Sequence, residues 1–131
     1  MMDKKEIENY LKIYPRIDEE IKSLEEDIAF FEDRKNKYSH ISSMSQDEND
    51  MLRLIENGLR EKKKQLAEHF TAKVNISKAM SRMDDCQKKI IQLRFWNNGV
   101  FTTWDEVARK MNISKRKAAY LYGNFVDSVN N

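Results

Sequence analysis

The stretch TTWDEVARKMNISKRKAAYLYGN, residues 102–124, predicts a helix, a tight turn and a second helix. Thr103 followed three residues later by a glutamate is a capping box, so the first helix should begin at Trp104. Asn112 stands where this helix must end, because Asn adopts the left-handed conformation more readily than most other non-glycine residues. Ser114 is then a suitable N-cap for the last helix. This order is the helix-turn-helix pattern.

Apolar residues recur at helical spacing on both sides of the turn. The small Ala108 suits a close crossing of the two helices, and Ile113 can fill the turn between them. The positions expected to point inward are Val107, Ala108, Met111, Ala118, Leu121, Tyr122, Phe125 and Val129. These positions predict the buried face of a compact helical domain.

The last helix begins with three consecutive cations, Lys115, Arg116 and Lys117. A helix N-terminus carries partial positive charge, so each cation there is unfavourable by about 0.3–1 kcal/mol. The negative potential of DNA reverses the sign of that contribution, and the motif places this end of its second helix in the major groove. We therefore expect the three cations to face DNA. The alternative is an ordinary solvated basic surface.

The DNA-facing residues should be those on the outer side of the motif. Arg116 can contact a guanine edge with two hydrogen bonds, and Ala119 can touch a thymine methyl group. Lys115 and Lys117 are expected at phosphates, which position the protein without reading sequence. The full predicted set is Thr103, Arg109, Lys110, Ser114, Lys115, Arg116, Lys117, Ala119, Tyr120 and Asn124.

The composition of the 131 residues predicts an all-α protein. Charged residues make up 35% and hydrophobic residues 40%, with three Gly and one Pro, a mixture that favours helices. Residues 1–70 carry 13 Lys and Arg against 17 Asp and Glu, whereas residues 71–131 carry 11 against 5. An acidic part joined to a basic part indicates that an anionic partner would meet the C-terminal part.

The N-terminal part contains a heptad seam, which implies a helix packed along its length against another helix. Pro15 should divide the seam into a short helix and a long helix that ends near Tyr38. After a serine-rich loop, the Ser45 capping box should open another helix over residues 46–70. The seam positions are Ile7, Tyr10, Tyr14, Ile17, Ile21, Leu24, Ile28, Phe31 and Tyr38. An intramolecular hairpin and a coiled-coil dimer both fit this pattern.

The part between the seam and the motif predicts further short helices. Residues 75–83 are expected to form one, and Asp84 should cap the next. Asn98 or Gly99 should then turn the chain. The resulting division is a helical hairpin or coiled coil in residues 1–72, for oligomerisation or partner binding, and a DNA-binding domain in residues 73–131.

Residues 90–129, IIQLRFWNNGVFTTWDEVARKMNISKRKAAYLYGNFVDSV, resemble the region 4 helix-turn-helix domain of bacterial sigma factors. IIQLRF, the W-D-E-V-A helix and N-I-S-K-R occur in the family's order. The family usually has Gly at the turn, where this chain has Asn112. No segment resembles the promoter-melting regions of a full sigma factor, so the resemblance does not imply a self-sufficient one.

Over its whole length the chain resembles small phage-encoded transcriptional regulators of the RinA/ArpU type, in which a motif like IENYLKIYPRIDEEI (residues 7–21) precedes a sigma-like motif. The resemblance implies sequence-specific binding to double-stranded DNA and control of late phage genes in a Gram-positive host. RNA polymerase, or a second copy forming a homodimer, is the partner expected for the N-terminal helices. A second function from a different class is that of a phage small terminase subunit, which joins a DNA-binding motif to an oligomerising hairpin.

No catalytic, cofactor or metal site is predicted, so we do not expect an enzyme. His40, His69 and Cys86 share no metal-ligand spacing, and no glycine-rich phosphate loop occurs. A lone cysteine fits a reducing cytosol, and the charged N-terminus does not resemble a signal peptide. No apolar run approaches the roughly 18 residues of a membrane span. We therefore expect a cytoplasmic protein of the bacterial host cell.

Overall fold

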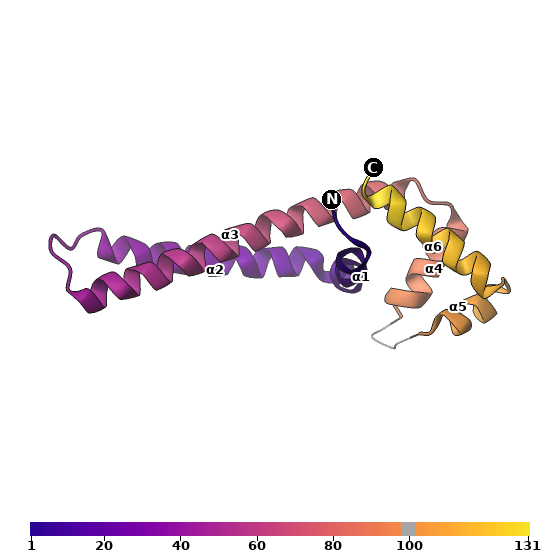
Figure 1. The fold of residues 1–131 in the computed structure, drawn as a ribbon, viewed down its shortest axis with the longest axis horizontal. Coiled ribbons are helices and arrows are strands. Elements are labelled where there is room, and N and C mark those ends of the chain that lie inside the picture. The colour runs from indigo at the N-terminus through magenta and orange to yellow at the C-terminus, as the bar shows by residue number, and fades with distance from the viewer. Residues whose placement is uncertain (98–101) are drawn as a thin grey trace. The chain divides into compact units, whose positions relative to one another are not determined.

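The computed structural model describes residues 1–97 and 102–131 of the chain. Within these ranges every regular element is a helix, which confirms the all-α prediction (Figure 1). The predicted turn at Asn98 or Gly99 lies outside the described residues. The elements are α1 (Lys4–Ile13), a 3₁₀ turn η1 (Tyr14–Arg16), α2 (Ile17–Tyr38), α3 (Gln46–Ser81), α4 (Asp85–Phe95), α5 (Trp104–Met111) and α6 (Lys115–Val129).

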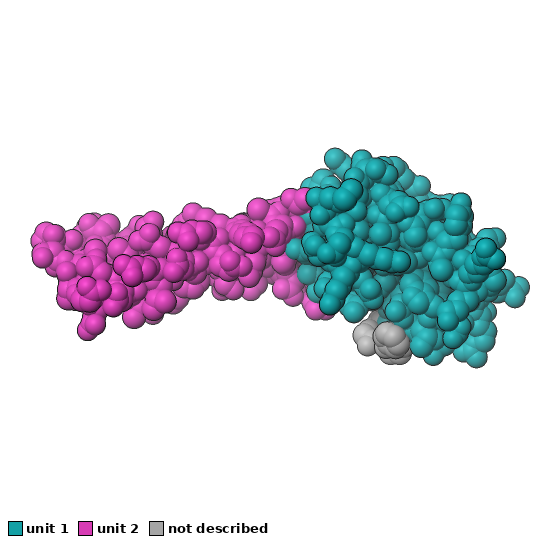
Figure 2. Space-filling model, in the orientation of Figure 1, with its two compact units in different colours: residues 1–15, 72–131 teal, residues 16–71 magenta. Residues whose placement is uncertain are grey.

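The chain divides into two compact units (Figure 2). Residues 16–71 form one, which we call the hairpin unit; residues 1–15 and 72–131 form the other, the basic unit. The basic unit carries 14 Lys and Arg against 8 Asp and Glu, whereas the hairpin unit carries 10 against 14. The division by charge therefore follows the division by structure. It differs from the predicted division in residues 1–15, which were expected to belong with the hairpin.

Helix α1 belongs to the basic unit because its apolar side is completely covered there. Ile7 and Leu11 are both 0% exposed and join the core of α3, α4, α5 and α6. The indole Nε1 of Trp96 donates a hydrogen bond of 2.7 Å to the carbonyl oxygen of Leu11. The Asn130 side chain also pairs with the backbone of Met2, donating from Nδ2 at 2.8 Å and accepting at Oδ1 at 3.0 Å. A heptad pattern gives the buried side of a helix but not which segment covers it.

In the hairpin unit, α2 packs against the first part of α3 as an intramolecular hairpin. Ile21 and Leu24, two of the predicted seam positions, are buried on α2, and Ile55 and Leu59 are buried on α3. Ion pairs join the two helices, with Lys62 Nζ 3.2 Å from Asp27 Oδ2 and Lys63 Nζ 3.4 Å from Glu32 Oε1. The break expected at Pro15 is η1, and both hydrogen bonds of the Ser45 capping box are present, at 3.1 and 3.2 Å.

Helix α3 runs without interruption from Gln46 to Ser81, so the prediction of one helix ending near residue 70 and another over 75–83 was wrong. The sequence contains neither Gly nor Pro between residues 59 and 98 to stop it. Ala72 and Ile76, both 0% exposed, continue the buried side of the helix into the basic unit. The charged residues around position 70 indicate that this part of α3 is exposed to solvent, and exposure does not by itself end a helix.

Candidate nucleic-acid interface

The helix–turn–helix arrangement of α5 and α6 begins with the predicted caps. The Oγ1 atom of Thr103 accepts a hydrogen bond from the Glu106 amide at 3.2 Å, and α5 starts at Trp104. Ser114 Oγ accepts from the Lys117 amide at 3.0 Å, and α6 starts at the next residue. Side-chain caps of this kind satisfy amides that the first turn leaves without a helical partner. The start of each helix is therefore fixed by local sequence.

The turn depends on the left-handed backbone of Asn112, at φ 56° and ψ 43°. The Asn112 amide donates to the Arg109 carbonyl at 3.1 Å, and the Ile113 amide donates to the Ala108 carbonyl at 3.0 Å. These two bonds form the Schellman motif, which satisfies the last carbonyls of α5. The predicted left-handed Asn is confirmed, and it reverses the chain in front of α6.

Replacing Asn112 by Val should destabilise the protein by about 1–2 kcal/mol, because a β-branched residue is disfavoured in the left-handed region. Asn112→Gly should leave stability unchanged or raise it, since Gly adopts this conformation without steric cost. Urea unfolding followed by circular dichroism measures both. Asn124→Val, at an exposed position within α6, is the matched control. Equal losses for the two valine variants would show that the turn does not depend on the Asn112 backbone.

The first turn of α6 presents its cations to solvent. Lys115, Arg116 and Lys117 are exposed, and this turn contains no acidic residue. Lys115 Nζ lies 3.4 Å from Asp105 Oδ1 of α5, in an ion pair with both side chains well exposed. Such a surface pair contributes at most about 1 kcal/mol. Among the described residues, Arg116 and Lys117 have no ion-pair partner.

The predicted contact residues lie largely on the solvent side of the two helices. On α6, Ala119 is exposed and Tyr120 is 67% exposed, whereas the preceding Ala118 is 0% exposed. Thr103 differs, because it is partly buried and its hydroxyl caps α5. The other exposed members of the set are Arg109, Lys110, Ser114, Lys115, Arg116, Lys117 and Asn124. The surface made by these exposed members of α5, the turn and α6 is called the basic face below.

Arg94 of α4 supports the start of α5, a role that the sequence reading did not find. Its guanidinium donates to the backbone carbonyl of Thr102, a residue that is 1% exposed. The same guanidinium carbon lies 4.9 Å from the ring centre of Trp104, a cation–π distance. The side-chain Nδ2 of Asn97 also donates to Thr102 Oγ1 at 3.3 Å. Helical spacing along α4 does not reveal that the Arg94 side chain contacts residues that follow the helix.

A cavity of about 160 Å³ is lined by Ala119 of the basic face together with Lys4, Glu8, Arg94, Trp104 and Tyr122. The Tyr122 hydroxyl is buried, with no hydrogen-bond partner among the described residues. Burial, reinforced by the negative charge of Glu8, raises the pKa of Tyr122 to about 12. The phenol therefore stays neutral at physiological pH, and its ring packs on Trp104 with ring centres 4.9 Å apart.

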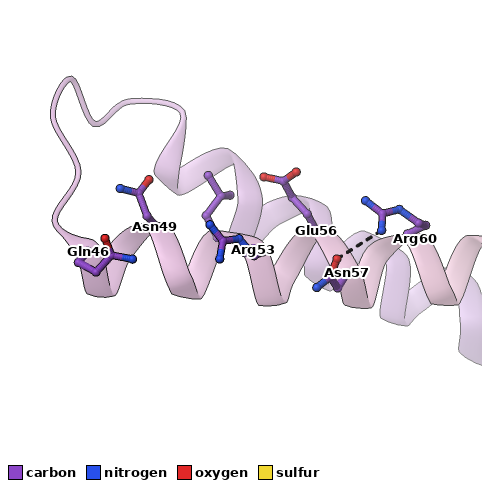
Figure 3. A pocket seen from close by; sticks show the side chains of 7 residues that line it. Gln46, Asn49, Arg53, Glu56, Asn57 and Arg60 are labelled. Carbon is purple, nitrogen blue, oxygen red and sulfur yellow. Dashed lines mark hydrogen bonds between the residues drawn. The ribbon is translucent and has the colours of Figure 1, made fainter.

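A second hollow, of about 340 Å³, lies along α3 in the hairpin unit (Figure 3). Its lining mixes both charges, and Arg60 Nη1 donates to Asn57 Oδ1 at 3.4 Å. The lining residues are Gln46, Asn49, Leu52, Arg53, Glu56, Asn57 and Arg60.

Across residues 1–97 and 102–131, no three His, Cys, Asp or Glu side chains are grouped to hold a metal ion. No helix in the same ranges has the length and apolar character needed to cross a membrane.

Comparison with known proteins assigns the chain to a family. The family model described as "Protein of unknown function (DUF722)" matches residues 1–131, so the chain belongs to this family. The match includes both the hairpin unit and the basic unit. No curated protein and no solved structure matches the chain.

Proposed function

We propose that this member of the DUF722 family binds double-stranded DNA through the basic face and regulates transcription. The observation that supports the proposal most strongly is the first turn of α6. Three consecutive cations are exposed there, while Ala118, Tyr122 and Phe125 bury the opposite side of the same helix. The buried side chains therefore anchor α6 in the core of the basic unit, and the exposed cations of its first turn can contact a partner.

The charge distribution favours an anionic partner at this place. The N-terminus of α6 adds its own partial positive charge to the three cations, and within residues 1–97 and 102–131 Lys115 alone of the three has an ion-pair partner. Arg109 and Lys110 extend the same charge onto the last turn of α5. A duplex offers closely spaced phosphates along its backbone, and binding releases condensed counterions. The attraction of these cations to the phosphates would then offset the repulsion between the cations themselves.

The residue types indicate a division of tasks on DNA. Arg116 has the planar donors that pair with guanine O6 and N7, and Ala119, three residues on, can touch a thymine methyl. Tyr120 and Asn124 add exposed polar groups further along α6. Lys115 and Lys117, with the cations of α5, would bind phosphates and set the register of the protein on the duplex.

The regulatory part of the proposal comes from the resemblance to sigma region 4 and to RinA/ArpU-type regulators. In this proposal the protein acts in the cytoplasm of a bacterial host, on late phage promoters. The acidic hairpin unit, with 14 acidic residues against 10 basic ones, is then the part available to RNA polymerase or a second copy. Basic and acidic surfaces on separate units would allow both contacts at once.

Fluorescence anisotropy of a labelled duplex across a salt series tests DNA binding. If four or five cations of the basic face each neutralise a phosphate, log affinity should fall with log salt with a slope of about −3 to −5. Selection from a randomised duplex pool should then yield a preferred sequence, because Arg116 and Ala119 are both exposed on α6 and are residue types that can contact base edges. A slope near zero, or no binding at low salt, would rule out the proposed role of the basic face.

A further inference from the structure

The hairpin unit has an apolar groove that the proposed DNA contact does not use. Its volume is about 210 Å³, and Phe30, Phe31, Arg34, Met51, Leu54 and Ile55 line it. Three of these side chains are unusually exposed for apolar residues, Phe30 at 56%, Met51 at 48% and Leu54 at 65%. We call these six residues the hairpin groove. An exposed apolar cluster with a groove inside it is typical of a protein interaction site.

Some of the lining residues of the groove are packed against the rest of the hairpin unit. Ile55 is only 6% exposed, and the Phe31 ring lies against Gly58, where an added Cβ would be 3.1 Å from the ring. The guanidinium of Arg34 lies 5.0 Å from the centre of the Phe30 ring. A cation–π contact of this kind holds the aromatic side chain at the rim. The site therefore needs little rearrangement to receive a partner.

The charges around the hairpin groove are of both signs. Arg34 lies in the groove, while Asp47 and Asp50 of α3 precede Met51 and Leu54 by four residues each. Residues four apart lie on the same side of a helix, so the acids flank the protruding apolar side chains. Apolar projections beside a hollow, and a cation beside acids, are the paired features that a two-fold contact between two copies requires, because such an interface uses the same surface patch on both subunits.

We propose that the hairpin groove binds the same groove of a second copy of this chain in a two-fold symmetric dimer. Leu54 and Phe30 of each copy would enter the other's groove, and Arg34 of each would face the other's acids. A standard interface covers about 800 Å² on each partner, with large apolar side chains at its centre and a polar rim. The three exposed side chains supply such a centre, and the acids around them supply the rim.

The dimer deepens the proposed function but does not depend on it for its existence. If DNA binding holds, two copies bring two α6 helices to one site, and the preferred sequence should contain two related half-sites. If DNA binding fails, the hairpin groove remains a site for self-association. The two proposals can therefore fail separately.

Sedimentation velocity of the full chain over a concentration series tests the dimer. Leu54→Asp places a charge at the centre of the interface and should raise the dimer dissociation constant by more than about tenfold. Phe70→Asp is the matched control, because Phe70 is also an exposed apolar residue of α3, at 45%, and is outside the groove. It should leave the dissociation constant unchanged, as should the volume-conserving Leu54→Met.

Circular dichroism of each variant shows whether the helices are intact, which they should be because position 54 is largely solvent-exposed. A monomeric wild type at all concentrations would overturn the dimer, and so would an oligomer that Leu54→Asp leaves intact or that Phe70→Asp dissociates. Anisotropy with duplex DNA on the same samples reports the proposed function independently. A monomer that binds DNA refutes the dimer alone, whereas a dimer that does not bind refutes the DNA proposal alone.

Discussion

A variant with Lys115, Arg116 and Lys117 all changed to Ala is expected to bind duplex DNA about 100- to 1000-fold more weakly than the wild type at about 50 mM salt. Counterion release contributes roughly a factor of ten per phosphate contact at that concentration. Two to three contacts are lost, because the Asp105 carboxylate beside Lys115 weakens the attraction of that lysine to a phosphate. Anisotropy titrations at one fixed salt concentration measure the difference.

The matched control removes the same number of charges from the hairpin unit. Lys22, Lys35 and Lys64 are exposed there, so a triple alanine variant at these positions lowers net charge equally. If net charge alone attracts DNA, both triple variants will lose affinity to the same extent. The proposed interface requires a large loss of affinity for the α6 variant and less than about threefold for the control, because the proposed complex has no phosphate contact at these three lysines and salt screens exposed charges that make no direct contact.

Phe125→Ala should lower the free energy of unfolding by about 3–5 kcal/mol, the usual cost of removing a buried aromatic ring. Phe125 is 1% exposed and lies in the core shared by α1, α3, α4, α5 and α6. This loss of stability has two parts, the hydrophobic free energy that the buried ring no longer contributes and the cost of the cavity that remains in the core. Urea unfolding at low protein concentration measures it, and a loss of this size is a large fraction of the stability of an ordinary domain.

Phe70→Ala provides the comparison for this prediction. Phe70 is 45% exposed in the hairpin unit, so its truncation should cost less than about 1 kcal/mol. A similar small cost for Phe125→Ala would contradict the central position of α6 in the core. DNA binding by Phe125→Ala should recover at temperatures where the variant is folded, because Phe125 is buried and is not one of the exposed residues that make the basic face.

The parts of the fold predicted correctly from sequence are those with local causes. The caps at Ser45, Asp84, Thr103 and Ser114 all form, because each requires only a side chain and an amide a few residues away. Asn112 takes the left-handed conformation for the same kind of reason. The inward positions of α5 and α6 followed from helical spacing, and Val126, 9% exposed, was the one buried residue of α6 not anticipated.

The errors concern contacts between segments distant in sequence. Nothing in the spacing of Ile7 or Leu11 indicates that α1 is covered by the basic unit and not by the hairpin. The continuity of α3 was missed because an exposed, charged stretch resembles a linker when its helical partner is unknown. Within the candidate site, the cations could be predicted from sequence. The Lys115–Asp105 pair and the support from Arg94 could not, because they depend on the packing of α4, α5 and α6.

The most direct test of the central claim is a map of the amides that respond to DNA. The full chain labelled with ¹⁵N is titrated with a short mixed-sequence duplex, and each backbone amide shift is followed. Binding through the basic face predicts that the largest changes fall in residues 109–120, the end of α5, the turn and the start of α6. Changes concentrated in residues 16–71, or no changes at all under low salt, would contradict it.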